Sequence, residues 1–524
     1  MPKPPQPEMM PLILAYLKDA GVPDGSVIEN LAIRLKLPSS RIYGFISQFP
    51  EFAGEAGRMR VRVCSGPACV ARGAGELFDA LRKEMPPDAL LVRDPGLMEW
   101  HDSPAVCIES PGREKVLIDS VDAEDLTAVL AAAERGDAVP SGPRIPIGAD
   151  LPAWWVAEES REAAESHESA IREFARDPAS AAKALADSWI ARAAGVREII
   201  AAASGRASGS PGPALMICDI PGREVENSID YQAALLHPKG VVLGAALGIL
   251  LSGAGKVVFY LPWNDKGLRK AITEAVEELL PGMGVSASVL EGPVHVPSSF
   301  EIGRAAIVQG RMLWEAASVY SRNGVGSGPE SIAVLPAASA VRLSRNLDGG
   351  QSEQWITGVV DCAGNHSLLA VRNGFRLKDD AKAIQTGSRL ISGVEAESNG
   401  LDETSQLVLL DSSQCMVQWA HYLATRAEDA CCGGCGAGRT APAVVAGLIE
   451  EVWAGKGDEK KLHQISSVLG SAGELALCPR LGQMLAPVFS TLNKFREEFE
   501  THALEGACQA GFSSTSARPQ TEKG

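Results

Sequence analysis

The sequence has 524 residues, of which 49 are Lys or Arg and 65 are Asp or Glu, so its formal net charge is −16. This length predicts about three or four domains, and the acidic balance argues against a nucleic-acid groove, which needs clustered Lys and Arg to contact phosphates. Eleven cysteines are too few for a disulfide scaffold in a chain of this size.

The sequence shows no signal for export or membrane insertion. Its first residues are rich in proline and lack the apolar region and cleavage site of a signal peptide. The longest apolar run, 240–255, is shorter than the roughly 20 residues that cross a bilayer. We therefore expect a buried helix there, and a cytoplasmic protein that is either free or peripheral on a membrane complex.

The N-terminal quarter predicts two units. Apolar residues recur at helical spacing in 1–57, which indicates a small helical cap. Residues 58–135 then alternate as strand, helix, strand, strand and helix, the order of a thioredoxin-like domain. Four prolines and three glycines in 136–152 are typical of an extended linker, so we place a linker at 136–153.

The remaining residues predict three further units and a tail. Strands and helices alternate in 154–330 as βαβ units, which indicates a doubly wound α/β domain. Short strands separated by Gly and Asn in 331–410 predict a small β-rich module. Four helices of bundle length follow in 411–505, and 506–524 has the composition of a disordered tail. The predicted fold class is a multidomain α/β protein with a C-terminal helical bundle.

Four cysteines near the C-terminus form the strongest chemical pattern. Cys431, Cys432 and Cys435 end one helix among glycines, and Cys478 precedes the last long helix. Thiolates from two helix ends can converge on one [4Fe–4S] cluster, and glycines let backbone N–H groups approach its sulfides. Small buried residues with an incidental cysteine pair are the alternative.

This segment resembles the C-terminal helical domain of the flavoprotein subunit of the complex I NADH dehydrogenase module. Cys432 and Cys435 match the first two cluster ligands of that family, and Cys478 with Leu481-Gly482 matches the fourth. The closing signature F-R-x-E-F-E is matched by residues 495–500. The resemblance implies a [4Fe–4S] cluster in this domain.

The third ligand position of the family is Gly438 in this sequence. Cys431 could replace it from the other side, or three thiolates could hold the cluster together with water, a labile iron or a carboxylate of Glu428 or Asp429. These alternatives remain open from the sequence.

The N-terminal part resembles the small thioredoxin-like subunit of the same module. Cys64 and Cys69 match its first two [2Fe–2S] ligands at C-x4-C spacing. The second cysteine pair of the family is missing, because only Cys107 lies nearby and it follows the Ser103-Pro104 that replaces Ala-Pro. We therefore expect a thioredoxin-like domain that has lost its [2Fe–2S] cluster, with Cys64 and Cys69 as a vestige.

The segment from Ala214 onward is similar to the FMN- and NADH-binding domain of the family in the order of its strands and helices, but its ligand motifs are changed. The glycine-rich loop is reduced to 205–213 and the acidic loop to 218–222, Glu301 alone remains of a third motif, and 335–339 replaces a fourth. We therefore expect the fold to be retained and FMN and NAD to be absent.

The remaining module resembles the ubiquitin-like β-grasp domain of the family. Cys362 lies in this module and Cys415 lies just after the module. Neither has partners at ligand spacing, so we interpret both as core thiols.

The resemblance covers nearly the whole chain, as a small-subunit homologue fused to a flavoprotein-subunit homologue, an order also similar to the diaphorase subunit of NAD-linked hydrogenases. It implies an electron-transfer and scaffold subunit with one [4Fe–4S] cluster, whose partners are other subunits of a redox complex. Two alternatives are an active flavin iron–sulfur dehydrogenase subunit linked to NAD(P)H or ferredoxin, and a purely structural protein with free thiols.

Overall fold

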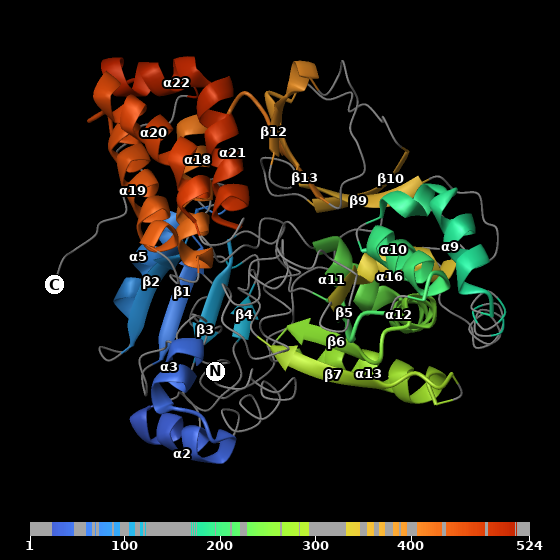
Figure 1. Cartoon of the computed structure of the whole chain (residues 1–524). Coiled ribbons are helices and arrows are strands. Elements are labelled where there is room, and N and C mark those ends of the chain that lie inside the picture. The colour runs from blue at the N-terminus through green and yellow to red at the C-terminus, as the bar shows by residue number, and fades with distance from the viewer. Residues whose placement is uncertain are drawn as a thin grey trace.

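A computed structural model gives the arrangement of the chain (Figure 1). It describes residues 24–46, 59–64, 69, 73–85, 89–94, 104–109, 116–118, 121, 169, 171, 173, 176–193, 195–209, 212–220, 228–262, 265–281, 283–292, 332–345, 354–360, 366–372, 381–386, 389–395, 406–431, 436–476, 480–508 and 510.

The N-terminal region contains a helix pair and a four-stranded sheet. The helices are α2 (Gly25–Leu35) and α3 (Ser39–Ile46), and α2 begins where the Asp24 carboxylate accepts a hydrogen bond from Val27 N at 2.9 Å. The sheet unit consists of β1 (Arg60–Cys64), α5 (Ala74–Glu84), β2 (Leu90–Asp94), β3 (Val106–Glu109) and β4 (Val116–Ile118).

This sheet has the strand order β2-β1-β3-β4. Strand β1 pairs with β2 in parallel and with β3 antiparallel, and β3 pairs antiparallel with β4. Leu77 and Leu81 of α5 pack in the same core as Val61 and Val63 of β1, because alternate strand residues point to one face. The mixed order agrees with the predicted thioredoxin-like domain; the helix expected at 122–136 lies outside the described residues.

The second unit is a helix-covered parallel sheet. Its elements are α9 (Pro178–Ala186), η2 (Trp189–Arg192), α10 (Val196–Ala207), β5 (Leu215–Asp219), α11 (Ser228–Leu236), α12 (Pro238–Ser252), β6 (Val257–Pro262), α13 (Lys266–Leu279), β7 (Ala287–Gly292), β8 (Ile332–Pro336) and α16 (Ala337–Arg345). All strand pairs are parallel, in the order β7-β6-β5-β8. The α/β layer therefore continues to Arg345, past the boundary we expected at 330.

Helix α12 occupies the centre of this unit, and twelve of its fifteen residues are buried. It is the apolar run that the sequence assigned to a buried helix. Among the described residues, no single helix is long and apolar enough to cross a membrane; α11 and α12 reach the required length only as a pair bent by 105°. Arg206 caps the end of α12 by donating to the carbonyls of Leu250 and Leu251 at 2.8 and 3.0 Å.

A five-stranded sheet follows, with strands β9 (Gln354–Val360), β10 (His366–Arg372), β11 (Ala383–Thr386), β12 (Arg389–Ser392) and β13 (Gln406–Leu410). Its order is β10-β9-β13-β11-β12. The first and last strands are parallel neighbours in the centre, and the other pairs are antiparallel. This is the arrangement of a β-grasp sheet.

The C-terminal unit is a helical bundle of α18 (Met416–Ala430), α19 (Gly436–Trp453), α20 (Glu459–Leu475), α21 (Arg480–Lys494), α22 (Arg496–Glu500) and the π-helix η4 (Thr501–Glu505). Each long helix packs on the next, and α18 also packs on α21, so the bundle closes (Figure 1). Trp419, Val445, Leu462, Leu485 and Phe499 contribute to its core. Residues 506–508 and 510, which we assigned to the tail, continue this packed unit, because Cys508 and Ala510 lie against the core.

Candidate functional site

The predicted cluster cysteines lie at connections between helices of the bundle. Residues 431–435 connect α18 to α19, and residues 476–479 connect α20 to α21. Short connections make successive helices antiparallel, so the end of α18, the start of α19, the end of α20 and the start of α21 all lie at the same end of the bundle. The ends of α20 and α21 approach closely there, because a Cβ on Gly473 would lie 3.3 Å from Cα of Gly482.

Only one of the four predicted ligands is among the described residues. Cys431 is the C-cap of α18; its N–H donates to the Glu428 carbonyl at 3.2 Å, and its partly buried side chain packs against the bundle core. Cys432, Cys435 and Cys478 lie outside the described residues. Their role as ligands stays a prediction that rests on the sequence and on the flanking helix ends.

Gly438, at the third ligand position of the resembled family, is buried in the first turn of α19. A side chain at this position would start inside the bundle rather than at its surface. The position therefore suits a ligand, although the residue present has no side chain to supply one.

Three thiols lie in the core of the thioredoxin-like unit. Cys64 ends β1, and its N–H donates to the Ala105 carbonyl at 2.9 Å. Cys69 and Cys107 are buried with it in the same hydrophobic cluster, and Cys107 lies on β3 as expected from the sequence. The structure thus places Cys64 and Cys69, the two cysteines that match ligands of the resembled family, in one core with a third thiol.

The α/β unit has a place where nucleotides bind in related architectures. Parallel sheets bind ligands outside the carboxyl ends of their strands, where the strand order reverses, and here β5 lies between β6 and β8. The helices that begin at this edge could offer their N-terminal N–H groups to phosphates. Two of these helix ends already carry a carboxylate from the chain itself.

Asp230 of α11 holds the start of α16, because its Oδ1 accepts a hydrogen bond from Ala338 N at 2.8 Å. Asp265 holds the start of α13 in the same way, accepting from Leu268 N at 3.0 Å, while its other oxygen accepts from the Tyr231 hydroxyl at 2.6 Å. The positive ends of both helices therefore face carboxylates of this chain.

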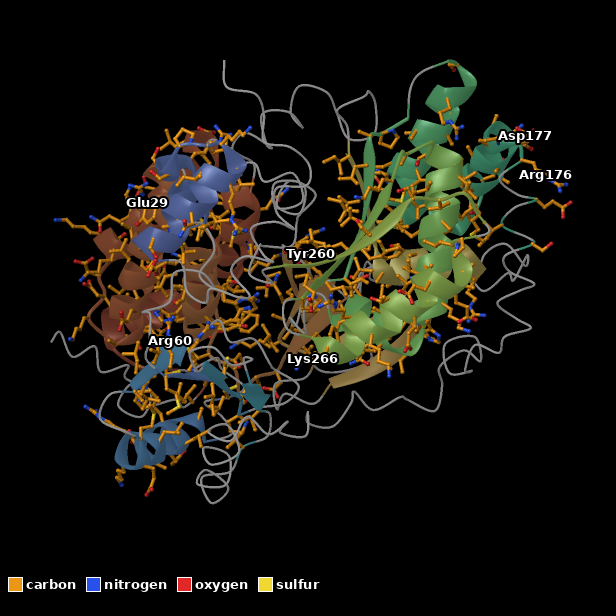
Figure 2. All side chains as sticks on the ribbon, turned by 90° about the horizontal axis from the view of Figure 1, so that it is seen from below. Glu29, Arg60, Arg176, Asp177, Tyr260 and Lys266 are labelled. Atoms are coloured by element: carbon orange, nitrogen blue, oxygen red, sulfur yellow. The ribbon has the colours of Figure 1, made fainter. Side chains whose placement is uncertain are left out.

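Electrostatics at this edge favour neutral groups. Burial raises the pKa of Asp230 to about 7; Asp219 adds to the rise, and the hydrogen bond from Ala338 and the charge of Arg342 oppose it. Burial also raises the pKa of Cys218. Tyr260 is buried beside these two residues, and a Cβ on Gly292 would overlap the Tyr260 ring. Figure 2 shows Tyr260 within the sheet, whereas Asp177, the N-cap of α9, lies at the periphery of the unit. The described residues of this edge are thus packed against one another.

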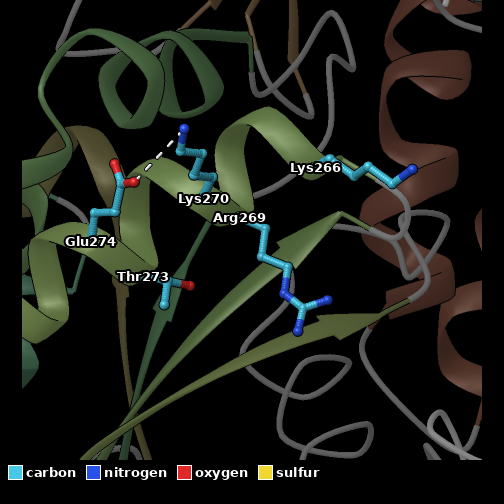
Figure 3. A pocket seen from close by; sticks show the side chains of 5 residues that line it. All are labelled: Lys266, Arg269, Lys270, Thr273 and Glu274. Atoms are coloured by element: carbon cyan, nitrogen blue, oxygen red, sulfur yellow. Dashed lines mark ion pairs between the residues drawn. The ribbon is translucent and has the colours of Figure 1, made fainter.

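One depression of the α/β unit lies on the surface of α13, along the first turns of that helix. It is lined by Lys266, Arg269, Lys270, Thr273 and Glu274, and Figure 3 shows the Lys270–Glu274 ion pair across it. Most of these side chains are exposed, and the depression is open to solvent, so it lacks the enclosure of a cofactor pocket.

A second group of metal-ligating side chains lies at the opposite end of the bundle. Ligand atoms of Cys415, His502 and Cys508 all lie within 4.8 Å of one another, and no other such group of three occurs among the described residues. Cys415 is buried in the bundle core, as we expected of a core thiol, and the fold also brings His502 and Cys508 to it. Sequence spacing could not reveal this group, because its members are 87 and 6 residues apart and Cys508 lay in the expected tail.

Family comparisons match both ends of the chain. Residues 3–122 match the thioredoxin-like [2Fe-2S] ferredoxin family, and residues 418–502 match the NADH-ubiquinone oxidoreductase-F iron-sulfur binding region. The second match covers the helices that flank the predicted cluster cysteines.

A curated relative and two solved structures agree with these matches. The NADP-reducing hydrogenase subunit HndC of Solidesulfovibrio fructosivorans is 25% identical over 331 residues, which are 52% of this chain and 66% of HndC. Two crystal structures of NAD+-reducing [NiFe]-hydrogenase, H2-reduced and air-oxidized, are 16% identical with TM-scores of 0.77 and 0.76. The two alignments cover 95% and 98% of this chain, and 94% and 96% of the hydrogenase chains. At this identity the two structures establish the fold.

Proposed function

We propose that this chain, a fused NADH dehydrogenase-like electron-transfer subunit with an iron–sulfur region, carries one [4Fe–4S] cluster and serves as a scaffold within a multi-subunit oxidoreductase. Cys432, Cys435 and Cys478 supply three thiolates, and Cys431 is the candidate for the fourth. FMN, NADH and a [2Fe–2S] cluster are not part of the proposed subunit.

The helix ends at one end of the bundle carry the cluster proposal. Cys431 caps α18 there, and the backbone continues from it directly into Cys432. In the sequence Cys478 falls between α20 and α21, and the end of α20 and the start of α21 lie at the same end of the bundle. When bound, a [4Fe–4S] cluster accepts and donates one electron at a time. The helices supply the rigid scaffold and the apolar core that limits solvent access.

The packed carboxyl edge of the parallel sheet supports the absence of FMN and NADH. Asp230 and Asp265 occupy two helix N-termini that a phosphate would need. A phosphate at either helix N-terminus would have to displace the Asp oxygen that already accepts from the first-turn N–H group. Together with the changed loop motifs, this favours an electron relay over a flavin enzyme.

An active flavin iron–sulfur subunit is the second candidate. The names of the relatives favour it, because one is an NADP-reducing and the other an NAD+-reducing hydrogenase. In that case FMN would copurify with the chain. In a scaffold with free thiols, neither flavin nor iron would be bound.

Electron paramagnetic resonance of the anaerobically purified full chain, after dithionite reduction, tests the proposal. We expect the fast-relaxing signal of one reduced [4Fe–4S] cluster, no [2Fe–2S] signal, and no flavin in the absorption spectrum. A flavin radical would support the second candidate and overturn the proposal. Protein without iron would leave only a scaffold.

Two serine variants make the assignment specific. C432S and C478S should each abolish the signal, whereas C218S, which replaces a buried thiol of β5, should keep it. Retention of the full signal in C432S would show that the cluster lies elsewhere in the chain.

A further inference from the structure

The Cys415, His502 and Cys508 side chains come from two segments that are far apart in the sequence. Cys415 is the N-cap of α18, His502 belongs to η4, and Cys508 follows three residues after the end of η4. Cys415 and His502 are buried, and Cys508 is partly exposed. Three ligating atoms from distant positions meet here because the end of the chain folds back on the start of the bundle.

The separation of the ligating atoms fits one shared ion. The Cys415 Sγ and His502 Nε2 atoms are 3.4 Å apart. A tetrahedral zinc ion with Zn–S of about 2.3 Å and Zn–N of about 2.0–2.1 Å places such atoms about 3.5 Å apart. Ligands of a [4Fe–4S] cluster bind different iron atoms, so their sulfur atoms lie farther apart than two ligands of one ion.

The group is separate from the predicted cluster. Cys415 and Cys431 cap opposite ends of α18, and 15 helical residues span about 22 Å at 1.5 Å per residue. A cluster bound near Cys431 therefore leaves Cys415, His502 and Cys508 available.

The Cys415 sulfur lies at the N-terminal end of α18. The Cys508 thiol beside it and burial raise the pKa of Cys415, so this thiol keeps its proton until a metal displaces it. The adjacent Met416 N–H donates to Glu498 Oε2 at 3.2 Å, whereas the backbone N–H groups of Val417 and Gln418 face the Cys415 sulfur. Thiol ligands exchange their protons for the metal on binding.

We propose that Cys415, His502 and Cys508 form a binding site for one zinc ion, with two thiolates, one imidazole and a solvent molecule in the fourth position. Binding of Zn²⁺ to the two thiols and the neutral imidazole releases two protons to solvent and involves no change in oxidation state. Because its ligands lie on α18 and on 502–508, the ion fastens the end of the bundle to its first helix.

Metal analysis of the full chain tests this proposal directly. Inductively coupled plasma mass spectrometry should find about one zinc per chain in the wild type. The zinc K-edge X-ray absorption spectrum should show two sulfur ligands at about 2.3 Å and nitrogen or oxygen ligands at about 2.0–2.1 Å. This spectrum is specific for zinc, so bound iron does not interfere, and it needs no variant.

Variants assign the ligands. C415S and C508S should each lower zinc content at least about tenfold, whereas H502C, which keeps a soft ligand, should retain it. C218S is the matched control with unchanged zinc. C432S should lose iron and keep zinc, so failure of the cluster proposal would not affect this test.

Three results would overturn the proposal. One is wild-type protein without zinc after purification in zinc-containing buffer. Another is zinc content that C415S and C508S leave unchanged. The third is a Cys415–Cys508 disulfide, identified by peptide mass spectrometry as the dominant state of anaerobically purified protein, because a disulfide cannot supply the two thiolates.

Discussion

Asp230 illustrates how one buried residue can determine the chemistry of a site. Its carboxylate lies at the start of α16, where it accepts the Ala338 N–H, and burial raises its pKa to about 7. In the unfolded chain the same carboxyl has its ordinary pKa of 3.8. The folded state therefore binds a proton more tightly than the unfolded state, and stability falls as pH rises through about 7.

D230N should remove this pH dependence. Between about pH 6 and pH 8, wild type should lose on the order of 1 kcal/mol of stability through Asp230, and D230N should not, because Asn is neutral throughout and still accepts from Ala338. Urea unfolding at each pH, monitored by hydrogen exchange of α16 peptides, measures the difference in stability between the two proteins. D177N, at an exposed helix cap, is the control, and an equal pH slope in D230N and wild type would contradict the shifted pKa.

Gly438 is the second informative single residue. We expect G438C to raise the iron content of aerobically purified protein, because a thiolate at this buried position of α19 completes the ligand set of the resembled family. Iron analysis and the reduced-state spectrum measure the effect. G447C, on the exposed side of the same helix, should change nothing, and equal iron in G438C and wild type would indicate that the fourth ligand is already present.

At the scale of elements, the crossing of α12 and α16 depends on a missing side chain. A Cβ on Gly244 would overlap the backbone carbonyl of Ala340, so the two helices can pack this closely only with glycine at the contact. Backbone atoms cannot move aside as the end of a flexible side chain can. The small-residue pattern of the apolar run is thus a requirement of helix packing.

G244A should lower the free energy of unfolding of the α/β unit by about 1–3 kcal/mol through this overlap. G447A is the matched control, because Gly447 lies within α19 with open space around it, and alanine there should stabilise the helix by up to about 1 kcal/mol. Thermal unfolding measured by calorimetry compares the stabilities of G244A, G447A and wild type. A G244A protein as stable as wild type would mean that the crossing adjusts freely.

At the scale of the whole molecule, a buried ion pair joins the β-grasp sheet to the bundle. Lys382 Nζ lies 2.7 Å from Glu498 Oε1, and both side chains are largely buried. The same ammonium donates to the Gln414 carbonyl at 2.9 Å, immediately before the N-cap of α18. The segments that contain Lys382, Gln414 and Glu498 thus meet at the Lys382 ammonium group.

K382M should destabilise the protein by about 3–5 kcal/mol, because Glu498 would remain buried without its partner. The double variant K382M/E498Q should recover part of this loss, since the uncompensated charge is gone. Urea unfolding measures both. K270M, which breaks an exposed pair with Glu274, should change stability by less than about 1 kcal/mol; a similarly small effect of K382M would show that the buried pair does not join the two units energetically.

The sequence by itself determined the order of the units and the resemblance that connects both ends of the chain with NADH dehydrogenase subunits. Periodicity and turn residues depend on neighbours along the chain, so β1, β3, β5, β6 and the four long bundle helices could be predicted from local patterns. The spacing of the cysteines near the C-terminus can be read directly from the sequence, so the iron–sulfur region could be recognised without the structure.

Only the tertiary structure decided which distant residues meet. Strand β8 joins β5 across more than a hundred residues, so the α/β layer extends beyond the boundary that composition suggested. Asp230 reaches Ala338, and Cys415 reaches His502 and Cys508, through packing that no local pattern encodes. Such contacts depend on how whole elements bury their apolar faces, and the chemistry that results from them belongs to the folded chain.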